Sequence, residues 1–116
     1  MKKFKYAITG IKNSLKEKSV FTQVMLGLLA IAGGITIKLE PYEWLAFFIC
    51  IGMVISLELV NSCIEKVCDM YKREYDERIR VIKDYSAGAV LVACFFSLVV
   101  CLYVVIRRIV WTKICF

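Results

Sequence analysis

Four side chains that could carry out chemistry recur along one short stretch, SLELVNSCIEKVCD, residues 56–69. Glu58, Asn61, Glu65 and Asp69 follow one another at steps of three, four and four residues. On an α-helix, with about 100° per residue, these positions fall within an arc of about 80°. We call these four residues the acidic stripe. Carboxylates on one helix face can accept a proton or hold Mg²⁺, so the stripe predicts acid–base or metal-assisted chemistry.

The stripe lies at the end of an apolar run, WLAFFICIGMVI. An isolated carboxylate in lipid costs a few kcal/mol or more, so the stripe must face protein, water or a cation. Glu58 follows Tyr42 by 16 residues, which is about 24 Å along a helix. This places Glu58 near a membrane boundary, whereas a transporter more often has its essential carboxylate near the midplane. A carboxylate at the boundary suits chemistry that joins a water-soluble reactant to a lipid headgroup.

Other charged residues are expected at the same depth. Glu17 precedes the first apolar segment, and Lys83 and Asp84 precede the third. Glutamates from two helices, here Glu17 and Glu65, can hold Mg²⁺ together with substrate phosphates. A lysine at that level can neutralise phosphate charge.

Inert interpretations of these charges stay open. A solvated helix end would also explain Glu65 and Asp69, because basic residues follow them. Three acidic residues between the second and third apolar segments would fit an ordinary hydrophilic loop: Glu74, Asp76 and Glu77.

Composition and periodicity predict the elements that position these residues. The chain has 116 residues and is 60% hydrophobic, whereas soluble domains average about 45–50%. We therefore expect one all-α integral membrane domain over residues 1–116. Its predicted parts are a surface helix over 4–16, transmembrane segments over 20–39, 42–70 and 85–106, and a polar cytoplasmic loop over 72–84.

The basic residues predict the orientation. The 4–16 segment has apolar residues on one face and lysines mostly on the other, which is typical of an amphipathic helix on a membrane surface. Six basic residues lie in the N-terminal arm, and six, including Arg73, lie between residues 66 and 84. The opposite side has four: Lys38, Arg107, Arg108 and Lys113. This asymmetry places the N-terminus and the polar loop in the cytoplasm.

Several kinds of site are disfavoured. The chain has no histidine, so proton transfer must involve Glu, Asp, Lys, Tyr or Cys, and most zinc and copper sites are disfavoured. The six cysteines form no C-x-x-C pair and lie mostly in apolar runs, where cysteine behaves as a small hydrophobic residue. A phosphate-binding P-loop motif is missing from the sequence.

Three motifs together resemble the prokaryotic diacylglycerol kinase family, which includes undecaprenol kinases. They are E-L-x-N-S-x-I-E-x-V-x-D from Glu58 to Asp69, E-Y at 74–75, and K-D-x-x-A-G-A-V-L-V from Lys83 to Val92. The resemblance covers about residues 4–106. It implies a homotrimer with three transmembrane helices and an amphipathic surface helix per subunit. It also implies active sites between subunits at the membrane–cytosol boundary.

The resemblance implies a role for each matched residue. Glu58 is then the catalytic base for the lipid hydroxyl, Glu65 and Glu17 hold the metal and contact the nucleotide, and Asn61 supports that site. The other nucleotide-side positions are Tyr6, Asp69, Glu74, Asp76, Lys83 and Asp84. The sequence departs from the family where Asp76 replaces a common histidine. It also departs around Glu17, where Ser19 and Gln23 replace Asn and His.

Residues and resemblance converge on Mg²⁺-dependent phosphoryl transfer from ATP to a membrane lipid alcohol in a bacterial inner (plasma) membrane. The acceptor is undecaprenol or diacylglycerol, and the Tyr42-Glu43-Trp44 start and CIGMVISLELVN look closer to the undecaprenol kinases. The expected partners are the lipid, ATP and further copies of the chain, with no nucleic acid. Two other classes stay open: a small oligomeric transporter or channel with an acidic polar path, and a structural membrane subunit.

Overall fold

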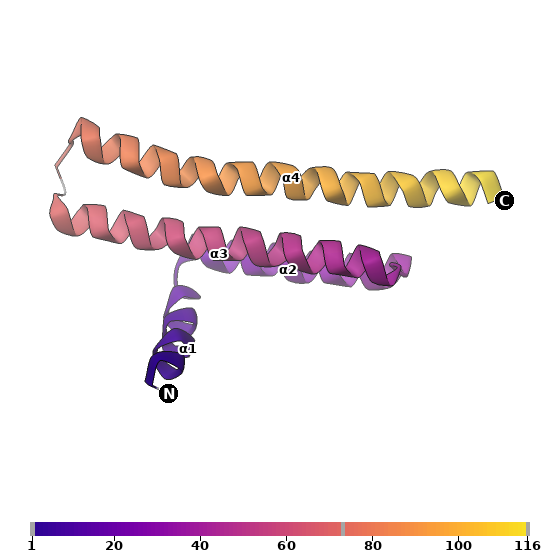
Figure 1. The fold of residues 1–116 in the computed structure, drawn as a ribbon, viewed down its shortest axis with the longest axis horizontal. Helices are drawn as coiled ribbons and strands as arrows, with labels where there is room; N and C mark the ends of the chain where they lie inside the picture. Colours follow the sequence, from indigo (N-terminus) through magenta and orange to yellow (C-terminus); the bar gives the residue numbers. More distant parts are fainter. Residues whose placement is uncertain (1, 73, 116) are drawn as a thin grey trace.

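The protein is described by a computed structural model that covers residues 2–72 and 74–115, with side chains up to Lys113. Arg73 lies outside the described residues. The described chain forms four helices and no strand: α1 (Lys2–Ser14), α2 (Lys18–Ile37), α3 (Pro41–Tyr71) and α4 (Glu77–Cys115). Helices α3 and α4 run antiparallel beside each other, α2 lies behind α3, and α1 projects away from them (Figure 1). The predicted all-α class is confirmed.

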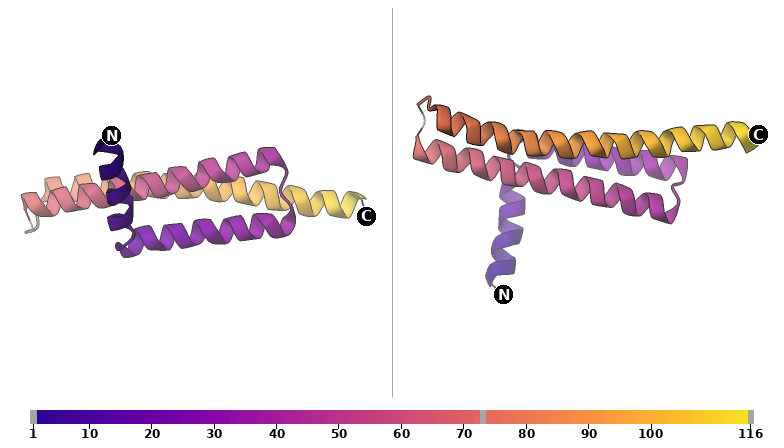
Figure 2. Two further views of the ribbon diagram at one scale, coloured as in Figure 1. Left: turned by 90° about the horizontal axis from the view of Figure 1, so that it is seen from below. Right: turned by 45° about the horizontal axis from the view of Figure 1, so that its top comes forward.

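Three helices, α2, α3 and α4, are long and apolar enough to cross a membrane, as predicted. The 20 residues of α2 span about 30 Å, which matches the hydrocarbon core of a bilayer. The 31 residues of α3 and 39 of α4 span about 46 and 58 Å, respectively. Figure 2 shows α3 and α4 passing the start of α2 at one end, and α4 alone passing the α2–α3 turn at the other.

The predicted loop over 72–84 is wrong in extent, because α4 begins at Glu77. The polar residues 77–84 instead form about two turns of helix. The side chain of Asp76 starts this helix by accepting a hydrogen bond from the backbone N–H of Arg78 at 2.9 Å. The third transmembrane segment was predicted to end at residue 106, but α4 continues to Cys115. A change of hydropathy marks the membrane boundary, and a helix can continue through it into water.

The turn between α2 and α3 is built from local signals. Lys38 adopts a left-handed conformation with φ 55° and ends α2. Glu40 and Glu43 form a reciprocal capping box, and Pro41 starts α3. Leu39 of the turn and Phe47 of α3 pack with Val104 of α4 in a small hydrophobic cluster.

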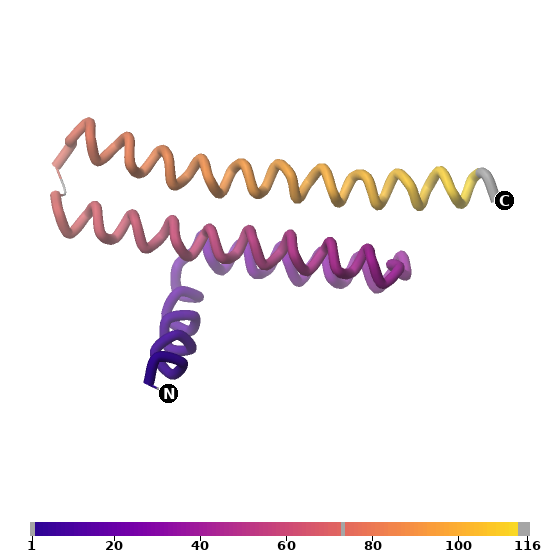
Figure 3. The backbone as a smooth tube through the Cα atoms, in the orientation of Figure 1, coloured from indigo at the N-terminus to yellow at the C-terminus, as the bar shows by residue number. Residues whose placement is uncertain are grey.

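Helix α3 is the central element, because it contacts both α2 and α4. The backbone trace in Figure 3 shows the two chain reversals that produce this order. An apolar groove of about 350 Å³ runs between the three helices and is lined by side chains such as Phe47, Val54 and Ser97. Within the described residues, five cysteines are free thiols: Cys50, Cys63, Cys68, Cys94 and Cys101.

Candidate active site

Burial decreases along the acidic stripe toward the end of α3. Glu58 is 5% exposed and Asn61 is 8% exposed, whereas Glu65 and Asp69 are exposed. The trend arises because α3 and α4 continue together beyond the start of α2 (Figure 2). The stripe therefore connects a protected carboxylate at one end with solvent-accessible carboxylates at the other.

The middle of the stripe is joined to α4 through Asn61. The hydroxyl of Ser86 donates a hydrogen bond to Asn61 Oδ1 at 2.5 Å. The amide nitrogen of Asn61 in turn lies 3.4 Å from Glu65 Oε1 and donates to it. This chain of contacts gives the Asn61 amide one orientation, with its carbonyl toward α4 and its N–H₂ group toward Glu65.

A second link between α3 and α4 joins Asp69 to Lys83. The ammonium of Lys83 lies 2.8 Å from Asp69 Oδ1, and both side chains are partly exposed. Lys83 therefore places a positive charge beside the exposed part of the stripe, where an anionic group of a ligand could reach it.

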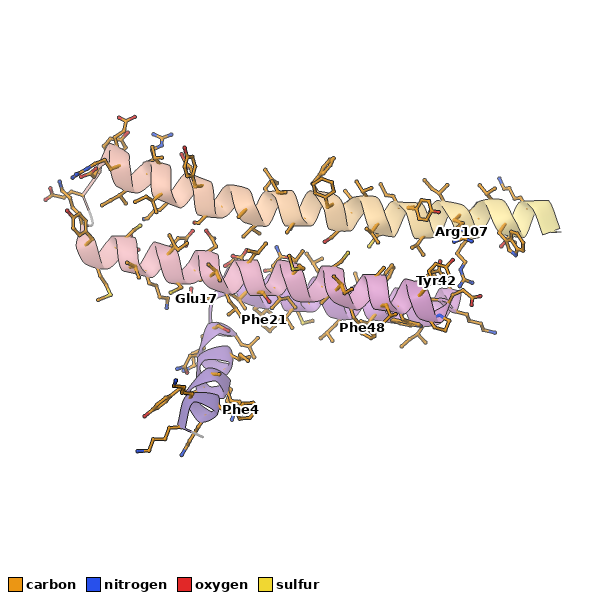
Figure 4. The ribbon with its side chains drawn as sticks, in the orientation of Figure 1. Phe4, Glu17, Phe21, Tyr42, Phe48 and Arg107 are labelled. Carbon is orange, nitrogen blue, oxygen red and sulfur yellow. The ribbon has the colours of Figure 1, made fainter. Side chains whose placement is uncertain are left out.

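Glu17 is brought to α3 from the junction between α1 and α2. It precedes α2 in an extended conformation, and Figure 4 shows it at this junction. Its carboxylate forms an ion pair with Lys66 of α3 at 2.6 Å. Lys66 follows Glu65 directly in the sequence, so Glu17 reaches the same turn of α3 as Glu65, although consecutive side chains point about 100° apart around a helix.

Asp76 is engaged in capping α4. It accepts hydrogen bonds from the backbone and the guanidinium of Arg78, and Lys72 lies 3.7 Å from its carboxylate. The Arg78 guanidinium, followed by its backbone N–H, holds the pKa of the Asp76 carboxyl below its usual value. The carboxylate is thus maintained in its charged form at the start of the helix.

The structure does not bring the remaining predicted residues into contact with the stripe. Tyr6 lies exposed on α1, Glu74 lies exposed between α3 and α4, and Asp84 faces Arg80 at 3.9 Å. Among the described side chains, none of these three is hydrogen-bonded to the stripe.

The carboxylates suit an open magnesium site. In the described part of the chain, no group of three or more acidic, cysteine or histidine side chains could enclose a metal ion. Mg²⁺ does not need such a group, because it commonly takes one or two carboxylates and completes its shell with phosphates and water. Glu17 and Glu65 provide this type of donor, although Lys66 pairs with Glu17 in the structure.

Sequence reasoning missed a polar cluster at the opposite end of the bundle. Glu43 is 2% exposed and pairs with Arg108 at 2.7 Å. Arg108 also donates to the carbonyl of Ile37, while Arg107 donates to and stacks over Tyr42 (Figure 4). Arg108 thus joins α4 to the α2–α3 turn.

Two residues beside the stripe, Ser86 and Lys66, were also without a predicted role. Ser86 lies three residues after Lys83, one helical step along the same face. A prediction that α4 begins at Glu77 would have placed Lys83 and Ser86 on the same face of one helix.

The family model and the curated relatives that match this chain are all lipid kinases of one kind. The family model for prokaryotic diacylglycerol kinase matches residues 5–105. The undecaprenol kinase of Bacillus subtilis is 35% identical over 69 residues, which cover 60% of this chain and 54% of that protein. The diacylglycerol kinase of Synechocystis sp. is 28% identical over 99 residues, 84% of this chain and 57% of the relative. That of Helicobacter pylori (strain J99) is 29% identical over 92 residues, 78% and 72% of the two chains. The chain thus spans little more than half the length of the first two relatives.

Proposed function

The chain belongs to the prokaryotic diacylglycerol kinase family, and from this premise we propose that it is a membrane lipid kinase. It transfers the γ-phosphate of ATP, with Mg²⁺, to the hydroxyl of a membrane lipid alcohol at the membrane–cytosol boundary. The observation that carries this proposal is the gradient along the stripe: Glu58 is buried, while Glu65 and Asp69 are exposed. A lipid hydroxyl and a water-soluble nucleotide can meet only where protected and accessible groups adjoin.

In this reaction a proton leaves the lipid hydroxyl, and ADP is the leaving group. The carboxylate of Glu58 takes the proton of the lipid hydroxyl while that oxygen attacks the γ-phosphorus. The bond between the γ-phosphorus and the β–γ bridging oxygen breaks, which gives the lipid phosphate and ADP. An alcohol is a weak nucleophile near neutral pH, so a positioned base next to the hydroxyl increases the rate.

The rest of the site binds and orients the nucleotide. Glu65 and Glu17 hold Mg²⁺, whose charge offsets that of the phosphates. Asn61 orients Glu65, and Lys83 supplies a further positive charge beside the stripe. We also assign to the nucleotide side the residues that match the family there: Tyr6, Asp69, Glu74, Asp76 and Asp84.

The proposed setting is the inner (plasma) membrane of a bacterium. We propose a homotrimer with shared active sites, as the membership in this family implies. We further propose that α1, which buries no residue, lies on the cytoplasmic membrane surface as an amphipathic helix. The N-terminus and the residues between α3 and α4 are then cytoplasmic.

We propose undecaprenol as the acceptor, with diacylglycerol second, since the relative at 35% identity is an undecaprenol kinase. The test uses purified protein, labelled ATP and Mg²⁺ with each lipid in turn. We expect Glu58→Gln to lower turnover by about 10²-fold or more while the protein still folds and binds nucleotide. Glu77→Gln, an exposed change in the first turn of α4, is the matched control.

Three outcomes would count against the proposal. Full activity of Glu58→Gln would remove Glu58 from the mechanism. Failure of the unaltered protein to phosphorylate either alcohol would refute the kinase function, and ion flux without ATP consumption would favour the transporter class.

A further inference from the structure

We infer that Ser86 is a positioning residue of the site, which sets the orientation of Asn61 and, through it, of the Glu65 carboxylate. This inference rests on the proposed function only for its kinetic consequence. The contact joins Ser86 of α4 to Asn61 of α3. In the motif K-D-x-x-A-G-A-V-L-V, position 86 is one of the two unspecified residues.

The donors and acceptors allow only one arrangement. An ionised carboxylate only accepts hydrogen bonds, so Asn61 must turn its N–H₂ group toward Glu65. Its carbonyl oxygen then points the other way and needs a donor, because Asn61 is only 8% exposed. The hydroxyl of Ser86 is that donor, at 2.5 Å.

Ser86 has a competing acceptor on its own helix. Its hydroxyl lies 3.1 Å from the carbonyl oxygen of Lys83, the kind of partner that serine within a helix usually selects. One hydroxyl has one proton, and the contact with Asn61 is shorter by 0.6 Å (3.1 against 2.5 Å). The proton is therefore directed across the interface from α4 to α3.

Loss of the hydroxyl should affect nucleotide and metal binding more than the chemical step. Without Ser86, the carbonyl of Asn61 has no donor and the amide no longer has a fixed orientation toward Glu65. Groups that orient metal ligands typically contribute about 10- to 100-fold to metal affinity. Because the contact between Asn61 and Glu65 is long, at 3.4 Å, we expect an effect of about tenfold.

The kinetic test compares Ser86→Thr with Ser86→Val, which have nearly the same shape but differ in the hydroxyl. We expect Ser86→Val to raise the KM for Mg·ATP about tenfold with kcat little changed, and Ser86→Thr to stay close to the unaltered protein. Ser97→Ala, three turns further along the same face of α4, is the control and should change neither constant. Equal KM values for the threonine and valine variants would overturn the inference.

An NMR test does not depend on activity. The chain has only two asparagines, Asn13 and Asn61, so protein labelled with ¹⁵N-asparagine shows two side-chain amide pairs. We expect Ser86→Val to shift the Asn61 pair and speed its proton exchange, with Asn13 unchanged and Ser86→Thr like the unaltered protein. If Ser86→Val leaves the chemical shifts and the proton exchange of the Asn61 amide unchanged, the positioning role is refuted. If the unaltered protein phosphorylates no lipid, the proposed function fails, while the NMR result still decides the contact.

Discussion

The adjacent glycines Gly33 and Gly34 provide a direct test of the packing between α2 and α3. Gly34 is buried, and a Cβ added there would lie 2.7 Å from Leu39 Cδ1 and 3.0 Å from Trp44 Cη2. Leu39 has little room to move, because it is 8% exposed and packs against Phe47 and Val104. A Cβ at Gly33 would meet nothing within 4 Å.

The two alanine variants share one effect and differ in the other. Each gains up to about 1 kcal/mol from the higher helix propensity of alanine. Gly34→Ala alone must also push Leu39 and Trp44 aside, and overpacking of this kind typically costs about 1–3 kcal/mol. The shared gain cancels in the comparison, so Gly34→Ala should be less stable than Gly33→Ala by about 1–3 kcal/mol, or about 5- to 150-fold in the folding equilibrium.

The measurement is reversible unfolding in mixed micelles titrated with a denaturing detergent and followed by circular dichroism. Gly33→Ala is the matched control, and we expect its midpoint at or above that of the unaltered protein. Because the α2–α3 turn lies at the opposite end from the acidic stripe, the folded fraction of Gly34→Ala should keep normal specific activity. A Gly34→Ala variant as stable as Gly33→Ala would show that α2 does not pack at this position as described.

Three further predictions concern charged residues. Glu65→Ala should weaken the apparent affinity for Mg·ATP by about tenfold or more, and an unchanged Mg²⁺ titration would reject its metal role. Lys66→Met removes the ammonium 2.6 Å from Glu17. Because this ion pair is exposed and therefore weak, the half-saturating Mg²⁺ concentration should fall by no more than about fivefold, and a rise would contradict competition for Glu17. Glu43→Gln removes the charge that pairs with Arg108 but keeps an oxygen that can accept its hydrogen bond. It should therefore lower the free energy of unfolding by about 1 kcal/mol, the difference between a charged and a neutral hydrogen bond. A double variant that also changes Arg108 to Gln should recover part of this loss, and no recovery would argue against the pair.

The sequence alone established the helical class, the number of spans and the acidic stripe. Each depends on a local property of the chain: hydropathy over about 20 residues for a span, and a step of three or four residues for a helix face. The end of α3 at Tyr71 follows the predicted segment closely. The start of α4 does not, because residues 77–84 are too polar for a membrane span yet continue the helix through a cap at Asp76.

Only the tertiary structure decided which side chains meet across helices. The pairing of Ser86 with Asn61, Lys83 with Asp69, and Glu17 with Lys66 depends on the rotation and register of one helix against another. Side-chain packing between helices sets those two quantities, and hydrophobic periodicity within one helix leaves them undetermined. The sequence thus specified which residues could carry out chemistry and on which faces. The packing of α4 and the α1–α2 junction against α3 specified their neighbours.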